Sequence, residues 1–473
     1  MNESITSTSL AHVAAHPRMT VIGTGYLGAT HAICMAILGF EVLGVDVDVR
    51  KIEALSAGRV PFFEPGLPDK LREALDSGRL RFTTDFAEAG SWGDVHFLCV
   101  GTPQSRESHA ADLTYVELAL TELASRIERR ALIVGKSTVP IGTAARLTRL
   151  VQEVSPVGEV VELAWNPEFL REGYAVKDTL HPDRLVFGVS SAWAEAQLRA
   201  AFRPILDNGT PLVVCDLATA ELVKVAANSF LATKISYINA MAEVCEVTGA
   251  DVNLLATALS FDSRIGGRFL KPGLGFGGGC LPKDIRAFAH RAEELGVGQA
   301  VAFLHEVDGI NQRRRTRTVD LIREMAGGTL EGVRVAALGA AFKPNSDDIR
   351  DAPALDVARM LQAEGAIVRV YDPEAINNAR ASYPELSYAD SLDDAVINAD
   401  VVALLTEWQE FRDADPDHLG TLVAQRCVVD GRHALDADDF RAKGWEYRAL
   451  GRPAQPRTVK LMSDVRDDVL LPA

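Results

Sequence analysis

Residues 19–28 read Met-Thr-Val-Ile-Gly-Thr-Gly-Tyr-Leu-Gly, and this stretch decides the fold of the first half of the chain. A short apolar run is followed by Gly23, Gly25 and Gly28, after which a helical pattern begins. Glycines at this spacing allow a tight turn between a strand and a helix and let backbone amides approach a pyrophosphate. The motif therefore predicts a dinucleotide-binding turn, although on its own it also fits a glycine-rich turn with no ligand.

A carboxylate stands where a dinucleotide-binding domain needs one. Asp46 ends the next apolar run, about twenty residues beyond the glycines, where it can accept hydrogen bonds from the hydroxyl pair of a ribose. A negative charge at that position would repel a 2′-phosphate. We therefore expect NAD rather than NADP as the cofactor.

Short apolar runs alternate with helical segments along the rest of this half, which predicts a doubly wound parallel sheet. Two loops that follow strands, residues 100–103 and 136–140, carry Thr102 and Thr138 to the carboxyl edge, where ligands of such sheets bind. Either loop alone also fits an ordinary turn. The predicted strands are residues 19–22, 41–46, 94–100, 132–136, 160–165, 184–189 and 212–215.

The composition is that of an ordinary globular protein with more than one domain. The 473 residues, of which 47% are hydrophobic and 24% charged, exceed what one core organises and exclude a mainly disordered or coiled-coil chain. The formal net charge of −16 repels phosphate backbones and anionic lipid, so we expect no nucleic-acid partner. No run of about eighteen uncharged apolar residues occurs, and we expect a cytoplasmic protein without a membrane span. The six cysteines are scattered, which predicts neither a disulfide framework nor a metal site.

The second half begins with a predicted long helix. Residues 218–248 contain neither glycine nor proline, and their apolar side chains recur at helical spacing. Glycines interrupt the helical pattern at 266–279 and end it at 327–328. Beyond that point strands and helices alternate again, which predicts a second, smaller α/β domain with a helix after Pro353. Its predicted strands are residues 333–338, 367–371, 401–405 and 426–429.

A cluster of arginines lies near the end of the helical region. We expect it to face solvent or a neighbouring subunit, because arginines are mostly exposed and a run of like charges on a helix usually forms a hydrated surface. The cluster consists of Arg313, Arg314, Arg315 and Arg317.

Residues 269–284 carry the clearest sign of chemistry: Phe-Leu-Lys-Pro-Gly-Leu-Gly-Phe-Gly-Gly-Gly-Cys-Leu-Pro-Lys-Asp. The glycine run lets the backbone wrap closely around a ligand and then presents Cys280 at a helix start, with Pro282 in the first turn. Amide dipoles at that position and the neighbouring Lys283 would favour the thiolate form, which is the nucleophile. A purely structural cysteine is the alternative.

Residues 166–173, Asn-Pro-Glu-Phe-Leu-Arg-Glu-Gly, follow another predicted strand. If the segment is helical after Pro167, Glu168 and Glu172 lie one turn apart on one face. Carboxylates placed in this way can act as acid or base. Exposed glutamates at a helix start are the alternative.

These motifs and several others resemble the UDP-glucose/GDP-mannose dehydrogenase family. The likeness covers residues 19–450 and keeps the order of the family's motifs. It implies an α/β fold in which two Rossmann-like doubly wound domains are joined by a long central helix and a helical dimerisation region. The matching motifs are GTGYLG (23–28), VGTP (100–103), KSTVP (136–140), NPEFLREG (166–173), GGGCLPKD (277–284), AFKPNSDDIRDAP (341–353) and VVDGR (428–432).

The resemblance implies an NAD-dependent, four-electron oxidation of a sugar nucleotide, with UDP-glucose as the expected substrate and UDP-glucuronate as the product. Cys280 would add to the aldehyde, the thiohemiacetal would be oxidised to a thioester, and water would release the acid. GDP-mannose or a UDP-N-acetylhexosamine is the alternative substrate, since Leu281 also fits the GDP-mannose branch. A nucleotide-binding scaffold without catalysis is a further alternative, which the presence of Cys280 disfavours.

The resemblance also assigns catalytic roles residue by residue. Lys224 and Asn228 would stabilise the oxyanion at the reacting carbon, and Asp284 would orient or activate water. Glu168, with Thr138 positioning a water, would act as acid or base in thioester hydrolysis. The division of labour between Glu168 and Asp284 stays open.

Further residues would hold the ligands. Arg264 would cross from a neighbouring subunit to the sugar, so the active site would depend on a homodimer. The expected cofactor ligands are Gly23, Gly25, Gly28, Asp46, Lys51, Thr102, Thr138, Glu172, Lys283 and Arg350. The expected ligands of the UDP-sugar are Glu168, Phe169, Leu170, Lys224, Asn228, Arg264, Phe269, Leu270, Gly273, Gly275, Cys280, Lys343 and Arg432.

The strand and helix patterns, together with the family resemblance, predict five parts of the chain. The expected parts are a flexible N-terminal extension (1–17), an NAD-binding Rossmann domain (18–215), a central helical dimerisation region (216–325), a C-terminal UDP-sugar-binding α/β domain (326–450) and a tail (451–473).

Overall fold

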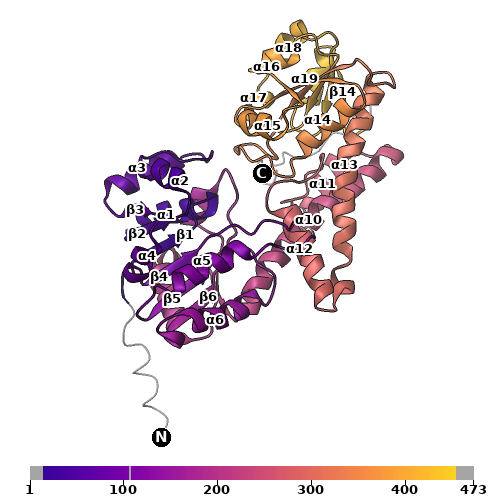
Figure 1. The fold of residues 1–473 in the computed structure, drawn as a ribbon. Coiled ribbons are helices and arrows are strands. Elements are labelled where there is room, and N and C mark those ends of the chain that lie inside the picture. Colours follow the sequence, from indigo (N-terminus) through magenta and orange to yellow (C-terminus); the bar gives the residue numbers. More distant parts are fainter. Residues whose placement is uncertain (1–13, 106–107, 454–473) are drawn as a thin grey trace. The chain divides into compact units, whose positions relative to one another are not determined.

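The computed structural model describes residues 14–105 and 108–453 (Figure 1). They form two compact units, one within residues 1–227 and the other within residues 228–473. The expected N-terminal extension and the expected tail fall largely outside the described residues. Within the described ranges, no helix is both long and apolar enough to span a bilayer.

The first unit contains a sheet of eight strands in the order β3-β2-β1-β4-β5-β6-β7-β8. Neighbouring strands are parallel except β6 and β7, which pair antiparallel. The seven predicted strands are present, some with ends shifted by a residue or two, but β3 was missed because it is an edge strand in which only Leu80 is buried. The strands are β1 (Met19–Ile22), β2 (Val42–Val45), β3 (Leu80–Thr83), β4 (Val95–Leu98), β5 (Ala131–Gly135), β6 (Val161–Trp165), β7 (Leu185–Gly188) and β8 (Leu212–Cys215).

Helices cover both faces of this sheet, because successive strand residues point to opposite sides. In β1, Val21 joins a core shared with helix α1, whereas the next residue, Ile22, joins a core shared with helices α5 and α6. The predicted doubly wound sheet is confirmed. The helices of this unit are α1 (Tyr26–Ile37), α2 (Val49–Ser56), α3 (Leu67–Asp76), α4 (Phe86–Trp92), α5 (Thr114–Ala124), α6 (Thr143–Val154), α7 (Ala175–Leu180), α8 (Ala192–Ala201) and α9 (Arg203–Asp207), with a 3-10 turn, η1 (Gly158–Val160).

The predicted long helix is present as α10 (Leu217–Thr248). In the second unit it packs through Ala232 against α12 and α13, and through Ala242 against α11. Lys224 and Asn228 are four residues apart and therefore lie on the same side of α10. The other helices of this region are α11 (Val252–Ser260), α12 (Leu281–Glu294) and α13 (Phe303–Met325), with a 3-10 turn, η2 (Gly298–Val301).

The second unit also contains a parallel sheet of six strands in the order β11-β10-β9-β12-β13-β14. The predicted second α/β domain is confirmed, although the sequence did not predict β11 or β14. Its strands are β9 (Arg334–Leu338), β10 (Ile367–Tyr371), β11 (Ser387–Tyr388), β12 (Val401–Leu404), β13 (Cys427–Asp430) and β14 (Glu446–Ala449). Its helices, which Figure 1 shows around the sheet, are α14 (Pro353–Ala363), α15 (Ile376–Ser382), α16 (Leu392–Val396), α17 (Gln409–Arg412), α18 (Pro416–Leu422) and α19 (Ala437–Ala442).

Candidate active site

The turn after β1 has the conformation that a dinucleotide phosphate requires. Gly23 has φ +87°, which favours glycine, and a Cβ on Gly28 would lie 1.8 Å from the carbonyl oxygen of Gly23. Both positions need glycine for the turn to close. Gly25 begins α1 without a side-chain cap, and a Cβ there would meet nothing within 4 Å. The first turn of α1 therefore offers both space and amide donors to a phosphate, which fits a dinucleotide.

Asp46 follows β2 directly and is fixed by its surroundings. Its Oδ2 accepts hydrogen bonds from the Thr24 amide and the Lys51 ammonium, both at 2.8 Å, and its Oδ1 accepts one from the Asp48 amide at 3.0 Å. Burial opposes ionisation of Asp46, but these donors outweigh burial, and the pKa of Asp46 lies below its usual value. Asp46 is therefore a carboxylate at neutral pH, with Lys51 as its ion-pair partner.

The loops after β4 and β5 are joined to each other. The Thr102 hydroxyl donates a hydrogen bond to the Thr138 carbonyl at 2.8 Å, and the Ser137 hydroxyl donates one to the Val100 carbonyl. Thr102 is buried and Thr138 is half-buried. The structure thus brings together the two loops that the sequence placed at the carboxyl edge of the sheet.

The segment after β6 is not helical. Residues 166–171 are irregular and α7 begins later, so the condition under which Glu168 and Glu172 would lie one turn apart is not met. The Glu168 carboxylate accepts hydrogen bonds from the backbone amides of Phe169 at 2.7 Å and Leu170 at 2.9 Å. A side chain that binds the amides next to it competes with helix formation, which explains the irregular backbone.

Glu168 also forms an ion pair that was not foreseen from the sequence. The ammonium of Lys136, directly after β5, lies 3.1 Å from Glu168 Oε2, and the Lys136 side chain is 4% exposed. Burial raises the pKa of Glu168, but Lys136 and the two amides outweigh burial and bring it below its usual value. One feature of the sequence could have indicated this ion pair, namely a lysine directly after a strongly apolar strand, because a buried ammonium needs a partner.

Glu64 and Tyr26 hold the loop that carries Glu172. The buried Glu64 carboxylate accepts hydrogen bonds from the amides of Gly173 and Ala175, both at 2.7 Å, and from the Tyr26 hydroxyl. Tyr26 belongs to the glycine-rich turn. The Glu172 loop and the dinucleotide turn are therefore linked, and neither Glu64 nor Tyr26 was a predicted site residue.

Phe169 lies within reach of two cations. The Arg184 guanidinium is 3.9 Å from the centre of its ring, and the Lys224 ammonium of α10 is 5.6 Å away. Lys224 is 9% exposed. The aromatic face thus helps to hold a buried ammonium on the side of α10 that also carries Asn228.

Cys280 is the N-cap residue of α12, so it stands at a helix start as the sequence predicted, and it is exposed. Four residues further on, the buried Asp284 accepts hydrogen bonds from the Asn228 side-chain amide at 2.7 Å and from the Lys283 ammonium at 2.8 Å. The Asp284 amide donates to the Cys280 carbonyl at 2.9 Å. Asn228 of α10 therefore meets Asp284 and Lys283, which lie in the first turn of α12 after the cysteine.

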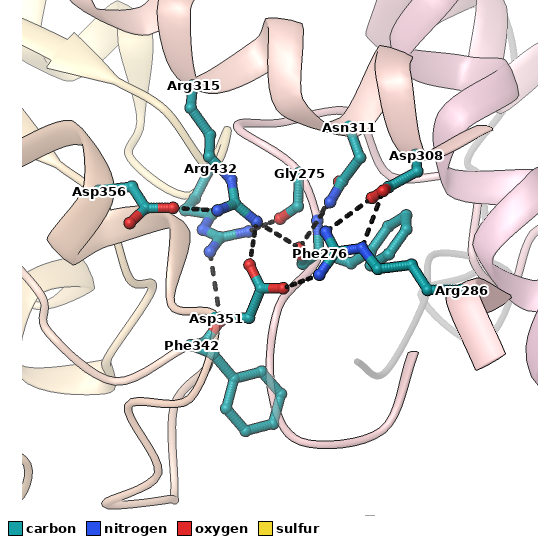
Figure 2. A network of polar contacts seen from close by, with 10 residues as sticks. All are labelled: Gly275, Phe276, Arg286, Asp308, Asn311, Arg315, Phe342, Asp351, Asp356 and Arg432. Atoms are coloured by element: carbon teal, nitrogen blue, oxygen red, sulfur yellow. Dashed lines mark hydrogen bonds and ion pairs between the residues drawn. The ribbon is translucent and has the colours of Figure 1, made fainter. Parts of the chain in front are cut away.

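Side chains of α13 and of the loop after β13 hold the backbone of residues 269–279, the glycine loop (Figure 2). Asn311 of α13 accepts a hydrogen bond from the Phe276 amide at 2.8 Å and donates one to the Phe276 carbonyl at 2.9 Å. Arg432 donates to the Gly275 carbonyl at 2.9 Å and to two other backbone carbonyls. Gly275 has φ +103°, and a Cβ there would lie 2.5 Å from Asn311 Oδ1, so this position needs glycine.

Asp351 extends this network to α12, as Figure 2 shows. Its carboxylate pairs with Arg286 of α12 at 2.9 Å and with Arg315 of α13 at 2.7 Å. Arg315 is buried, and so is Arg314, whose guanidinium lies 3.6 Å from the Glu246 carboxylate. The prediction that the arginine cluster faces solvent or a subunit is wrong for these two residues, because acidic partners within the unit compensate their burial.

The remaining predicted ligands lie on loops of the second unit. Arg264 is exposed and pairs with Asp262 at 2.6 Å. Arg350 is exposed and pairs with Asp348 at 2.6 Å, while its carbonyl accepts a hydrogen bond from the Gly278 amide. The other members of the predicted set are the half-buried Lys343, the exposed Phe269 and the buried Leu270 and Gly273.

One unit thus carries a dinucleotide turn with an ionised aspartate, and the other carries an exposed cysteine on a glycine-rich loop. The doubly wound fold and the turn are typical of dinucleotide-binding proteins, a class that includes the NAD-dependent dehydrogenases. Residues 17–206, 218–313 and 336–437 match the NAD binding domain, the central domain and the UDP binding domain of the UDP-glucose/GDP-mannose dehydrogenase family. The chain belongs to this family.

Relatives and solved structures support the assignment over most of the chain. The UDP-glucose 6-dehydrogenase of Rhizobium meliloti is 40% identical, over 92% of this chain and 100% of its own. The UDP-glucose 6-dehydrogenase TuaD of Bacillus subtilis is 39% identical, over 92% and 94%. A UDP-glucose dehydrogenase structure from Pyrobaculum islandicum has a TM-score of 0.85 at 36% identity, over 92% and 98%. A UDP-D-ManNAc dehydrogenase structure from Pyrococcus horikoshii has a TM-score of 0.81 at 27% identity, over 93% and 100%.

Proposed function

We propose that this chain is a UDP-glucose 6-dehydrogenase, which oxidises UDP-glucose to UDP-glucuronate with two molecules of NAD. Relatives that carry this name are 40% and 39% identical over 92% of the chain. The observation that carries the proposal is Cys280, exposed at the start of α12 beside the hydrogen-bonded pair Asn228 and Asp284. A nucleophile at this position allows an aldehyde to be captured and oxidised a second time.

When bound, NAD accepts the hydride in each oxidation. We assign its pyrophosphate to the turn formed by Gly23, Gly25 and Gly28, and its ribose hydroxyls to Asp46. The space at the start of α1 and the ionised state of Asp46 support this assignment. The other proposed cofactor ligands are Lys51, Thr102, Thr138, Glu172, Lys283 and Arg350.

Side chains of this protein carry out the remaining steps of the reaction. Lys224 stabilises the negative charge that develops at the reacting carbon through its ammonium, and Asn228 does so through its side-chain amide. The Cys280 thiolate adds to the aldehyde carbon, and the sulfur holds the sugar as a thioester after the second hydride has left. Thr138 positions the water that hydrolyses the thioester, and Glu168 takes a proton from that water.

We place the sugar nucleotide on the glycine loop, with Lys343 and Arg432 as its cationic neighbours. Asn311 and Arg432 already hold the Gly275 and Phe276 backbone, so the loop offers preformed groups to a ligand. The other proposed substrate ligands are Glu168, Phe169, Leu170, Lys224, Asn228, Arg264, Phe269, Leu270, Gly273 and Cys280.

We further propose that the enzyme is a homodimer. Phe230, Tyr237 and Val244 recur at seven-residue intervals on α10 and are 67%, 50% and 50% exposed. Apolar side chains aligned along a helix favour burial against a partner. A second copy of α10 would cover them, and the exposed Arg264 would be available to the sugar bound by the partner chain.

Incubation of the purified enzyme with UDP-glucose and NAD tests the activity. We expect two NADH for each UDP-glucose consumed, loss of turnover in Cys280→Ala, and a trapped ester adduct in Cys280→Ser. A preference for GDP-mannose or a UDP-N-acetylhexosamine would assign a different substrate, and NAD binding without turnover would indicate a scaffold. Full activity in both variants would refute the covalent route.

A further inference from the structure

Lys136 is a buried cation at the end of strand β5. Its side chain is 4% exposed, and a buried ammonium is unfavourable unless it is paired. Its Nζ lies 2.8 Å from Asn166 Oδ1 and 3.1 Å from Glu168 Oε2. The Lys136 ammonium thus connects the sheet to the carboxylate that is the proposed base of thioester hydrolysis.

The position of Lys136 is fixed by the sheet and not by Glu168. Strand β5 lies between β4 and β6 and is parallel to both. Asn166 is itself held, because its Nδ2 donates a hydrogen bond to the Val186 carbonyl at 3.0 Å. The Lys136 Nζ also lies 5.7 Å from the centre of the Phe202 ring. These contacts belong to the core, so they hold the ammonium in place whether or not Glu168 is charged.

Glu168 retains one hydrogen-bonding position. An ionised carboxylate offers roughly four acceptor positions. Its Oε1 accepts from the amides of Phe169 and Leu170, and its Oε2 accepts from Lys136. Three positions are filled by donors that are themselves fixed, so the remaining one, on Oε2, has a defined direction. A water molecule at that position would donate its hydrogen bond to Oε2.

We propose that Lys136 is a positioning residue that keeps Glu168 ionised and aims its remaining acceptor position at the hydrolytic water. This inference rests on the proposed function, in which Glu168 is the base of thioester hydrolysis. Glu168 takes a proton from water, the water oxygen bonds to the thioester carbon, and the C–S bond breaks with its electron pair on Cys280. The products are the sugar carboxylic acid, the Cys280 thiolate and protonated Glu168, and both carboxylic acids then lose a proton to solvent.

The charges around Glu168 agree with this assignment. Burial raises the pKa of Glu168, but Lys136 and the two amides bring it below its usual value. The nearby thiols of Cys34 and Cys99 are neutral, because burial raises the pKa of each to about 12. His31, which feels the charge of Lys136, is also neutral, because burial lowers its pKa. A carboxylate held in its ionised form near pH 7 accepts protons and does not donate them.

Rapid-quench kinetics of Lys136→Met and Lys136→Arg test the inference. In Lys136→Met we expect the first two NADH per active site to form nearly as fast as in the parent enzyme. Turnover should then be at least tenfold slower, with acylated Cys280 accumulating in the intact mass. Lys136→Arg keeps the charge and should recover most of the rate, whereas Glu168→Gln should accumulate the same acylated species as Lys136→Met.

Thr20→Val is the matched control. It removes a buried hydrogen bond to His96, 2.7 Å long, in the same sheet but away from Glu168. This variant should lose thermal stability without accumulating acylated enzyme. If the NADH burst and turnover fall together in Lys136→Met, with no acylated Cys280, the inference is overturned. If Lys136→Met does not fold, Lys136→Gln decides the question by the same criterion.

A measurement without substrate separates this inference from the proposed function. The carboxyl carbon of Glu168, labelled with ¹³C and assigned with Glu168→Gln, should titrate below the usual glutamate range in the parent enzyme and at higher pH in Lys136→Met. An unchanged Glu168 titration in Lys136→Met would refute the inference even in an active enzyme. A parent enzyme that forms no NADH from UDP-glucose would refute the proposed function, and the titration would still decide the role of Lys136.

Discussion

Asp46 and Lys51 form an ion pair, and their opposite charges would act in opposite directions on a 2′-phosphate at this position. The Asp46 carboxylate, 2.8 Å from the Lys51 ammonium, would repel a 2′-phosphate. In Asp46→Ser the ammonium loses its partner and becomes available to that phosphate. We expect the ratio of kcat/KM for NADP to that for NAD to rise at least tenfold, about 1.4 kcal/mol, in steady-state assays with UDP-glucose.

The double variant Asp46→Ser, Lys51→Met distinguishes the effect of the Asp46 charge from that of the Lys51 charge. It should lose its preference for NAD without gaining activity with NADP, because neither the repulsive nor the attractive charge remains. If Asp46→Ser alone rejects NADP as strongly as the parent enzyme, charge at this position does not select the cofactor.

His96 makes the first unit sensitive to acid. Its ring is fully buried beside Thr20, and burial lowers its pKa from 6.5 to about 3. Below pH 6.5 the unfolded chain binds a proton at this site, whereas the folded chain does so only near pH 3, so stability falls as the pH decreases through this window. His96→Gln should remove up to about 1.4 kcal/mol per pH unit of that dependence, measured by urea unfolding. An unchanged slope would assign the acid sensitivity to other groups.

Single residues could be predicted where the backbone or the reaction demands one residue type. Gly28 has no room for a Cβ, and Cys280 stands at a helix start after a glycine run, so both could be recognised without knowledge of their neighbours. The proposed role of Lys136 could not be predicted, because it depends on contacts with Asn166, 30 residues away, and with Glu168. The sequence contains both partners but does not show that they meet.

At the scale of elements, Asn311 joins helix α13 to the glycine loop by pairing with both backbone groups of Phe276. Asn311→Leu would leave this buried amide and carbonyl without their partner, at a cost of about 1–3 kcal/mol for each group. We expect a lower Tm, faster hydrogen exchange at the Phe276 amide and a higher KM for UDP-glucose.

The matched control is Asn378→Ala, which removes an exposed hydrogen bond to the Asp347 carbonyl. Its effect on the free energy of unfolding should be below about 0.5 kcal/mol. If Asn311→Leu is destabilised but binds UDP-glucose with unchanged KM, the contact supports the fold and not the substrate loop.

Elements could be predicted where their pattern is local. Helix α10 contains no glycine or proline, and its apolar side chains recur at helical spacing. Whether the segment after Pro167 is helical was left open by the sequence, and it is not helical because the Glu168 carboxylate accepts hydrogen bonds from the amides next to it. Arg315 was expected on a surface, yet its partner Asp351 comes from a distant loop and makes burial possible. Hydrogen bonds from side chains to the backbone and ion pairs between different elements leave no periodic pattern in the sequence.

At the scale of the molecule, the parts of the proposed reaction are distributed over the two compact units. The first unit holds the dinucleotide turn and Glu168, and the second holds Cys280 and the glycine loop. The boundary between the units falls between residues 227 and 228, within α10. Two α/β domains with a long helix between them could be predicted from alternating patterns, but nothing in the composition of α10 marks this boundary.

The exposed side chains of Phe230, Tyr237 and Val244 on α10 allow the proposed homodimer to be tested. Phe230→Glu combined with Tyr237→Glu would place charges where the proposed partner helix packs, and burying unpaired charges is strongly unfavourable. We expect a monomeric mass by light scattering and at least a tenfold loss of activity, because Arg264 could no longer reach the partner's sugar. Ile367→Glu, at a position in β10 that is 62% exposed, is the control and should keep the parent's mass and activity. A dimer that survives the double substitution would place the interface elsewhere, and an active monomer would show that one chain completes the site by itself.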